Sequence, residues 1–181
     1  MQPSFTVSCA ILVLALLLPN HIKAVNCPDG WTADPSSVSY CYKAYKERRA
    51  YLDAEAQCKA DGGSNGNLAS IHNAFENQFL LSFVLENGIE FNPGIGFVWI
   101  GLSNLHSSVL TDYKWIDGSA LTYTHWFVGD QIHQAHPEVD SCVGFFVSDL
   151  PNFSAYAATW TAGPTGACNQ TWPFVCQVSL V

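Results

Sequence analysis

The chain has 181 residues, with 15 acidic and 7 basic side chains and a formal net charge of −8. This length suits a single domain with an ordinary hydrophobic core. The acidic excess argues against nucleic acid and against an anionic membrane surface as partners. We therefore expect a one-domain protein that does not bind nucleic acid.

An apolar run near the amino terminus is typical of a secretory signal peptide. Residues 9–18 read CAILVLALLL and are followed by Pro19, whereas a membrane-spanning helix needs about 20 apolar residues. No later run is long enough to cross a bilayer. The sequence predicts a leader over residues 1–24 and one domain over residues 25–181. We expect a secreted, extracellular protein without membrane insertion.

Without the leader the chain keeps six cysteines, which are Cys27, Cys41, Cys58, Cys142, Cys168 and Cys176. An even number in a secreted chain predicts three disulfides. Six cysteines allow 15 pairings, and their spacing alone does not choose among them. Two Asn-x-Ser/Thr sequons predict N-glycosylation at Asn152 and Asn169.

The first expected helix covers residues 51–61. Ala54 and Cys58 share one face of it, and the Gly62-Gly63 pair that follows is a stop signal. Most of the basic side chains cluster around this segment, namely Lys43, Lys46, Arg48, Arg49 and Lys59. We interpret the cluster as a solvated approach to the helix, and an anionic glycan partner is the alternative.

A second helix is expected to begin after Asn73. The Asn73 side chain can cap it, and Glu76 stands at the capping-box position. Phenylalanines recur every fourth residue, at Phe75, Phe79 and Phe83, before Asn87-Gly88 ends the element. This pattern predicts that the phenylalanine stripe belongs to the core.

Short β-type runs follow the helices, at residues 97–102, 113–116, 142–147, 159–161 and 174–178. Helices first and strands later indicate an α+β domain. Residues 117–141 show little regular pattern, and a loop of that length in a compact domain is usually functional.

Six motifs in this order resemble those of the C-type lectin-like domain family. They are Cys27-Pro-Asp-Gly-Trp31 with Cys41-Tyr42, Ala54-x-x-x-Cys58, Leu68-Ala-Ser-Ile-His72 leading into Glu76-Asn77, Trp99-Ile-Gly-Leu102, Trp115-Ile-Asp-Gly118 and Pro173-Phe-Val-Cys176. The resemblance covers nearly all of residues 26–178. It implies two helices, a mixed or antiparallel sheet and a long protruding loop. It also implies the long form of the domain, with disulfides Cys27–Cys41, Cys58–Cys176 and Cys142–Cys168.

In that family the long loop carries calcium and, in many members, a sugar. The resemblance implies ligands from a Glu-Pro-Asn or Gln-Pro-Asp triplet, an acid before the next cysteine, and a Trp-Asn-Asp triplet. Here the first triplet reads Asp130-Gln131-Ile132, the acid is Asp140, and the last triplet reads Trp160-Thr161-Ala162. Calcium takes about six to eight oxygens, so these residues predict a degenerate site. A separate calcium site of the family ends in an acid where this chain has Gln177.

The end of the loop, HQAHPEVDSC over residues 133–142, offers a different ligand set. His125, His133 and His136, with Glu138 and Asp140, combine the imidazole and carboxylate groups that suit zinc. Our candidate metal ligands are Asp130, His133, His136 and Asp140. The alternative is a polar loop without metal. Our candidate ligand-binding residues are Phe127, Asp130, Gln131, Glu138, Asp140, Trp160 and Thr161. We read Trp99, Trp115 and also Trp160 as core residues, and calcium stays open as a cofactor.

Catalytic motifs are missing from the sequence. It contains no Gly-x-Ser-x-Gly or His-Glu-x-x-His pattern and no phosphate-cradling glycine loop, and three disulfides would leave no cysteine as a nucleophile. We therefore expect recognition and not catalysis. The first hypothesis is carbohydrate binding to a glycan or glycoprotein, with calcium dependence in doubt. The second is calcium-independent binding of a protein surface by a degenerate sugar site.

Overall fold

The computed structural model describes residues 26–35, 39–89, 91, 94–105, 112–128, 141–162 and 167–180. The expected leader and residues 129–140 of the expected long loop lie outside these ranges.

The elements alternate between strands and helices more closely than the sequence suggested. In chain order they are β1 (Thr32–Ala33), β2 (Tyr40–Arg49), α1 (Tyr51–Gly62), the 3₁₀ turn η1 (Gly63–Asn65), β3 (Gly66–Leu68), α2 (Ala74–Glu86), β4 (Ile95–Ser103), β5 (Lys114–Trp115), β6 (Cys142–Ser148), η2 (Pro151–Phe153), β7 (Trp160–Ala162), η3 (Ala167–Asn169) and β8 (Trp172–Ser179). Both expected helices and all five expected strands are present, which confirms the α+β fold. Strands β1, β2 and β3 were not expected.

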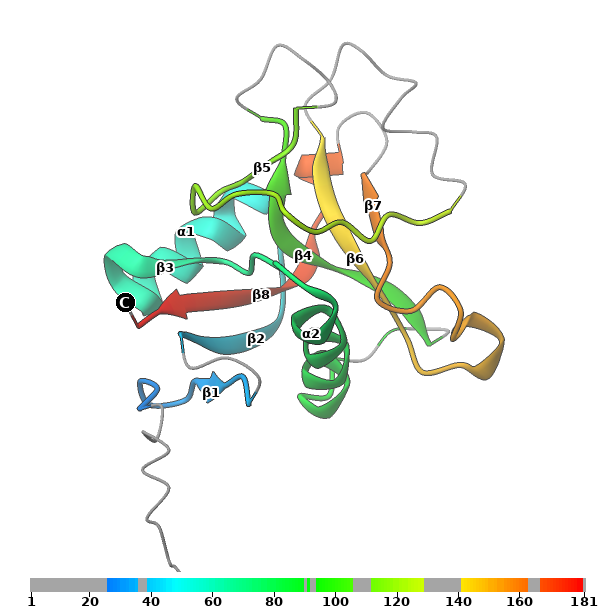
Figure 1. The fold of residues 1–181 in the computed structure, drawn as a ribbon, viewed down its shortest axis with the longest axis horizontal. Coiled ribbons are helices and arrows are strands. Elements are labelled where there is room, and N and C mark those ends of the chain that lie inside the picture. Colours follow the sequence, from blue (N-terminus) through cyan, green and yellow to red (C-terminus); the bar gives the residue numbers. More distant parts are fainter. Residues whose placement is uncertain are drawn as a thin grey trace, which may run out of the picture.

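One sheet organises the molecule. Its strands follow the order β1-β2-β8-β4-β6-β7, with β3 paired to β8 and β5 paired to β4. The contact between β4 and β8 is parallel, and the other pairs are antiparallel. The last strand therefore lies in the middle of the sheet, beside the long early strand β2 (Figure 1).

Helix α1 is held to the sheet by a face of closely packed side chains. Tyr51, Ala54 and Cys58 are buried in a cluster with Trp99 and Phe174 from the sheet. Their spacing of three and four residues places them on one side of the helix. The helix ends where expected, since Gly63 has the positive φ of 66° that a glycine adopts most easily.

Asn73 caps helix α2, as expected. Its Oδ1 accepts hydrogen bonds from the backbone N–H groups of Phe75, at 2.9 Å, and Glu76, at 3.0 Å. The Glu76 carboxylate reaches back to the backbone N–H of His72, at 2.7 Å, one residue earlier than a standard capping box would place it. Two side chains thus satisfy three amide donors around the start of the helix.

The Asn73 cap gives a first testable prediction. Asn73→Ala should lower the free energy of unfolding by about 1 kcal/mol, because two helix amides lose their acceptor. Chemical denaturation of the two proteins measures the difference. Asn73→Ser keeps an acceptor oxygen without placing a second charge beside Glu76, and it should stay within about 0.5 kcal/mol of the parent. An equal loss in both variants would contradict the capping role.

The expectation that the whole phenylalanine stripe is core was wrong at Phe75. Phe75 is 77% exposed, Phe79 is half-buried and Phe83 is only 4% exposed. A step of four residues overshoots one helical turn by about 40°, so Phe75 lies about 80° around the helix from Phe83. The buried face runs instead through Leu80, Phe83 and Val84.

The basic cluster is mostly exposed and leads into helix α1, as expected, although most of its members lie on a strand that was not expected. Lys43, Lys46, Arg48 and Arg49 lie on strand β2, and Lys59 lies on α1. Lys43 forms an ion pair with Asp61, at 2.9 Å, and Lys59 forms one with Glu55, at 3.1 Å. Part of the cluster therefore anchors α1 to its surroundings.

Three disulfides staple the fold, and they are the pairs that the resemblance implied. Cys27–Cys41, Cys58–Cys176 and Cys142–Cys168 have Cα–Cα distances of 5.7, 5.3 and 5.1 Å. These distances lie in the usual range for disulfides. The second bond joins helix α1 to the central strand β8 across 118 residues of sequence.

Candidate functional site

Residues 125–127, within the expected long loop, are hydrogen-bonded to strand β7. The backbone N–H of Phe127 donates to the carbonyl of Trp160, at 2.9 Å, and the N–H of Trp160 donates to the carbonyl of His125, at 2.8 Å. Trp126 pairs with Trp160 as a parallel bridge. These bonds hold the segment that ends at Val128 against β7.

Trp160 belongs to the interior. It is 0% exposed, and its indole N–H donates to Asn77 Oδ1 at 2.8 Å. Its ring makes edge contacts with Trp115 and Trp126, at centroid distances of 5.5 and 5.9 Å. Trp99 and Trp115 are buried too, which confirms all three as core residues. Trp160 therefore has no exposed surface for a ligand.

The other two residues of the β7 triplet offer few oxygen atoms that could bind a metal ion or a ligand. Thr161 is half-buried, and Ala162 is buried with 1% exposure. The triplet thus offers one hydroxyl where the resemblance implies an amide and a carboxylate. Of the candidate residues on β7, Thr161 alone has an accessible side chain.

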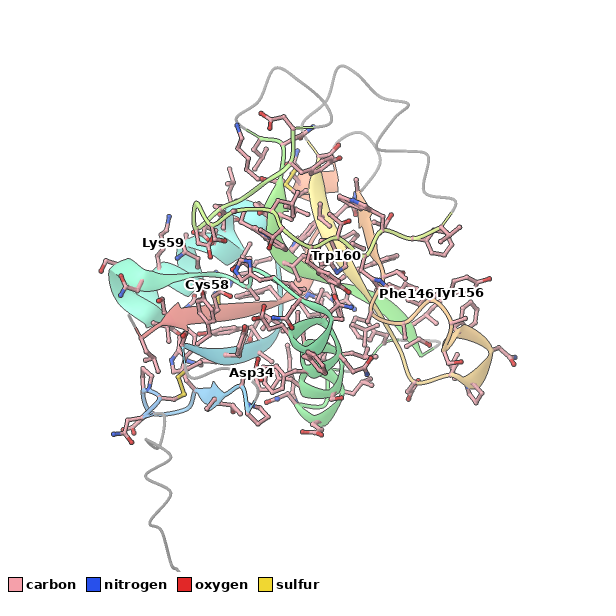
Figure 2. All side chains as sticks on the ribbon, viewed as in Figure 1. Asp34, Cys58, Lys59, Phe146, Tyr156 and Trp160 are labelled. Carbon is pink, nitrogen blue, oxygen red and sulfur yellow. A yellow bond between two sulfur atoms is a disulfide. The ribbon has the colours of Figure 1, made fainter. Side chains whose placement is uncertain are left out.

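Phe127 takes part in an exposed apolar area beside β7, which we call the Phe127 surface and define as Phe127, Val128 and Tyr156. The rings of Phe127 and Tyr156 meet edge to face at 5.2 Å. Tyr156 is 43% exposed and Val128 is 93% exposed. Tyr156 lies at the rim of the molecule, while Trp160 lies inside it (Figure 2). Exposed apolar side chains such as these can contact a ligand.

The remaining candidate ligands are Asp130, Gln131, His133, His136, Glu138 and Asp140, and all of them lie outside the described residues. The degenerate calcium set and the alternative zinc set therefore stay predictions. Among the described residues, no group of three or more His, Cys, Asp or Glu side chains could hold a metal ion.

Gln177 forms a buried polar network that the sequence analysis did not anticipate. The residue is 2% exposed, and its Oε1 accepts from the backbone N–H of Ser70 at 2.9 Å. Its Nε2 donates to Ser70 Oγ at 2.6 Å and to Asp117 Oδ2 at 2.8 Å. The sequence marked Gln177 only as a lost calcium ligand. In the structure its amide oxygen accepts one hydrogen bond and its amide nitrogen donates two.

Asp117 is held by four hydrogen bonds. Its Oδ2 accepts from Gln177 and from Ser70 Oγ, the latter at 2.7 Å. Its Oδ1 accepts from the backbone N–H of Ser119 at 2.9 Å and from Ser119 Oγ at 2.6 Å. Both carboxylate oxygens are therefore occupied, and the chain direction at the start of the loop is fixed.

This network predicts the effect of restoring an acid at position 177. Gln177→Glu should lower the free energy of unfolding by about 2 kcal/mol at neutral pH, because a buried carboxylate would face Asp117. Burial and that charge raise the folded-state pKa of the new carboxyl above its unfolded value. The loss is therefore largest at neutral pH and shrinks as the pH falls through the folded pKa.

Denaturation of the parent and of Gln177→Glu between about pH 4 and pH 7 measures this effect. Gln177→Met is the matched control, since it removes the hydrogen bonds without adding a charge. This control introduces no new carboxyl, so its difference in stability from the parent should change less with pH than that of Gln177→Glu. A glutamate variant whose difference changes no more than that of the methionine control would contradict the charge argument.

Both sequons are accessible. Asn152 lies in η2 and Asn169 in η3, and both side chains are exposed. Their glycosylation stays a prediction. In the described part of the chain no helix combines the length and the apolar character needed to span a membrane.

The fold and the three disulfides define a lectin-like domain, and comparison with known proteins agrees. The chain belongs to the lectin C-type domain family, whose model matches residues 47–178. C-type lectin lectoxin-Lio1 of Erythrolamprus poecilogyrus is 38% identical over 121 residues, which are 67% of this chain and 68% of the relative.

A second relative matches over almost the whole length. It is one of the subunits of the snaclec coagulation factor IX/factor X-binding protein of Trimeresurus stejnegeri, 29% identical over 173 residues and covering 94% of this chain and 95% of the relative. Among solved structures, human lithostathine superimposes with a TM-score of 0.62 at 27% identity, covering 87% of this chain and 94% of that one. The family relationship thus extends through sequence and fold.

Proposed function

We propose that this protein is a secreted recognition domain that binds glycans of extracellular ligands without depending on bound calcium. The binding region is the side of the domain that carries the Phe127 surface, which we call the loop-bearing end. The proposal includes the leader over residues 1–24 and the domain over residues 25–181. The observation that carries it is the β7 triplet, where a buried tryptophan, a half-buried threonine and a buried alanine stand. A calcium ion that needs about six to eight oxygens finds too few there.

The Phe127 surface offers a contact area for a sugar that does not need a metal ion. Its two rings are held by their mutual contact at 5.2 Å, and the backbone of Phe127 is held by the hydrogen bond from its N–H to the Trp160 carbonyl. Rigid aromatic side chains give a large contact area at a low cost in conformational entropy. Polar side chains of the adjoining loop, Gln131 and Glu138 among them, would add hydrogen bonds to the hydroxyl groups of a sugar.

Phe127→Ala tests this proposal. A glycan array first identifies a bound oligosaccharide, and titration then compares the variant with the parent. We expect the variant to bind at least about tenfold more weakly, a loss of about 1.4 kcal/mol, because the ligand loses its aromatic contact. The affinity of the parent should be the same in calcium and in chelator.

Phe75→Ala is the matched control, since Phe75 is another exposed phenylalanine but lies on helix α2. Its binding should equal that of the parent. Binding that chelator abolishes would contradict the calcium-independent mode and assign the role to loop carboxylates such as Asp130 and Asp140. An array without any bound glycan, in either buffer, would contradict glycan binding itself.

Recognition of a protein surface is the second candidate. It is favoured by Val128, which is 93% exposed next to the aromatic rings and adds apolar area that suits a protein partner. The factor IX/factor X-binding relative carries a protein ligand in its name. Free monosaccharide would displace a glycan ligand and leave a protein ligand bound. Enzymatic removal of glycans from the ligand would give the same distinction.

A further inference from the structure

A polar pocket lies at the end of the sheet where β3 and the carboxyl end of β8 meet. Its volume is about 400 Å³. The side chains that matter for its chemistry are Tyr40, Asn65, Asn67, Asp117, Ser119 and Gln177. All of these residues are described by the structure, and none of them was a candidate ligand contact in the sequence. An open depression of this size can hold a small ligand against its floor.

The strand register explains why the polar side chains converge. Asn67 of β3 stands opposite Gln177 of β8, and Tyr40 of β2 stands opposite Ser179 of β8. Residues that are directly opposite each other in a sheet project to the same face. Polar side chains of three neighbouring strands therefore lie side by side on one face of the sheet. Asp117 lies next to them, because its carboxylate accepts a hydrogen bond from Gln177.

Several hydrogen-bonding groups in this pocket are poorly used by the protein. Asn67 Nδ2 lies 3.3 Å from the Asn65 carbonyl, and Asn65 Nδ2 lies 3.4 Å from the Ser179 carbonyl. Both distances exceed the usual range for such bonds. Burial and the charges of Asp117 and Glu76 raise the pKa of Tyr40, so its hydroxyl stays protonated at neutral pH. That hydroxyl makes no hydrogen bond within the described residues.

The lining disfavours other ligand classes. Among the described residues no Lys, Arg or His side chain lines the pocket, so an anion would meet the Asp117 carboxylate without a compensating cation. A metal ion would have to displace the four hydrogen bonds that the Asp117 oxygens already accept. Among the described lining residues, the Tyr40 ring is the only large apolar group. The others carry amide, hydroxyl or carboxylate groups or are glycine. A neutral ligand that both donates and accepts hydrogen bonds fits these conditions.

We propose that this pocket binds a neutral saccharide unit and forms a second carbohydrate site on the domain. Saccharide hydroxyls can pair with the amides of Asn65 and Asn67 and with the Tyr40 hydroxyl, and the Tyr40 ring can contact a sugar face. The site is separate from the loop-bearing end. The segment that follows β5 crosses the face of the sheet from the β3 side to the β7 side (Figure 1). Asp117 accepts a hydrogen bond from Gln177 of β8, whereas Phe127 donates one to Trp160 of β7.

Nuclear magnetic resonance of the mature secreted protein tests the proposal. The probes are the methyl glycosides of D-glucose, D-galactose, D-mannose and N-acetyl-D-glucosamine, each added in chelator up to about 20 mM to reach millimolar dissociation constants. At least one of them should shift the side-chain amide signals of Asn65, Asn67 and Gln177 in a saturable way. The methyl glucuronide should bind more weakly than the glucoside, because Asp117 repels its carboxylate.

Two substitutions and one control sharpen the test. Asn67→Ala and Tyr40→Phe should each weaken this binding by about tenfold, since each removes one hydrogen-bonding group and keeps the neighbouring structure. Gln78→Ala, at an exposed amide on α2, should leave it unchanged. Unchanged thermal midpoints of all three variants would show that the fold is intact.

The two carbohydrate proposals fail independently. If Phe127→Ala abolishes every amide shift while Asn67→Ala does not, the pocket is not a binding site and the loop-bearing end remains one. If the pocket variants lose binding while Phe127→Ala keeps it, the second site stands whatever the loop does. The absence of a saturable shift with all four neutral glycosides would overturn the pocket proposal.

Discussion

Replacing both Cys58 and Cys176 with alanine is expected to lower the free energy of unfolding by about 5 kcal/mol. The bond closes a loop of 118 residues, and the chain-entropy model assigns the largest stabilisation to the longest closed loop. Both cysteines are fully buried beside Trp99 and Phe174, so alanine leaves little new polar surface in the core. Urea denaturation of the oxidised parent and of the double variant measures the difference.

The other disulfides provide matched controls. The Cys142–Cys168 bond closes 26 residues, and the Cys27–Cys41 bond closes 14. The same model gives losses of about 3.5 and about 3 kcal/mol for their alanine variants. The expected order of the three losses follows the loop lengths. A loss for the Cys58–Cys176 variant that is no larger than that for the Cys27–Cys41 variant would contradict the entropic account.

The helices could be predicted because their signals are local. The Asn73 cap and the glycine stops act within a few residues, and the structure keeps both. Strand β3 was not predictable in this way. It has three residues, two of which are Gly66 and Asn67, and its pairing depends on residues near 177. Short strands of low β-propensity are set by their partners and not by their own sequence.

Strand β2 was missed for a different reason. The half of β2 that carries Lys46 to Arg49 is exposed, and its register with β8 shifts between Tyr45 and Arg49. Charged residues on an irregular strand do not alternate between apolar and polar positions, so the pattern predicted a helix approach. The neighbouring Cys41-Tyr42 is buried, yet two residues are too few to reveal a strand.

The polar network shows the same limit at the level of a site. Asp117 and Gln177 are 60 residues apart in sequence, and Ser70 and Gln177 are 107 apart. A contact at such a separation leaves no trace in local periodicity. The Trp115-Ile-Asp-Gly118 motif pointed to a special position but not to its partner. The resemblance implied the disulfide pairs, whereas the hydrogen-bond partners of Asp117 were found only in the structure.

Phe83→Ala should lower the free energy of unfolding by about 3 to 5 kcal/mol. Phe83 is 4% exposed and packs in the larger core cluster with Leu80, Val84 and Tyr42. Removing its ring leaves a cavity between α2 and the sheet that backbone elements on both sides keep open. The measurement is urea denaturation at constant protein concentration, with the slope checked for a change in the denatured state.

The neighbouring phenylalanines make this prediction specific to one helix face. Phe75→Ala should change the free energy of unfolding by less than about 0.5 kcal/mol, because its ring is already in water. Phe79→Ala should fall between the two, since its half-buried ring still stacks on Phe83 at 5.6 Å and meets Tyr42 at 5.4 Å. Equal losses in the free energy of unfolding for all three variants would mean that the three phenylalanines are equally buried, as the sequence suggested. A graded series fixes the side from which α2 covers the sheet.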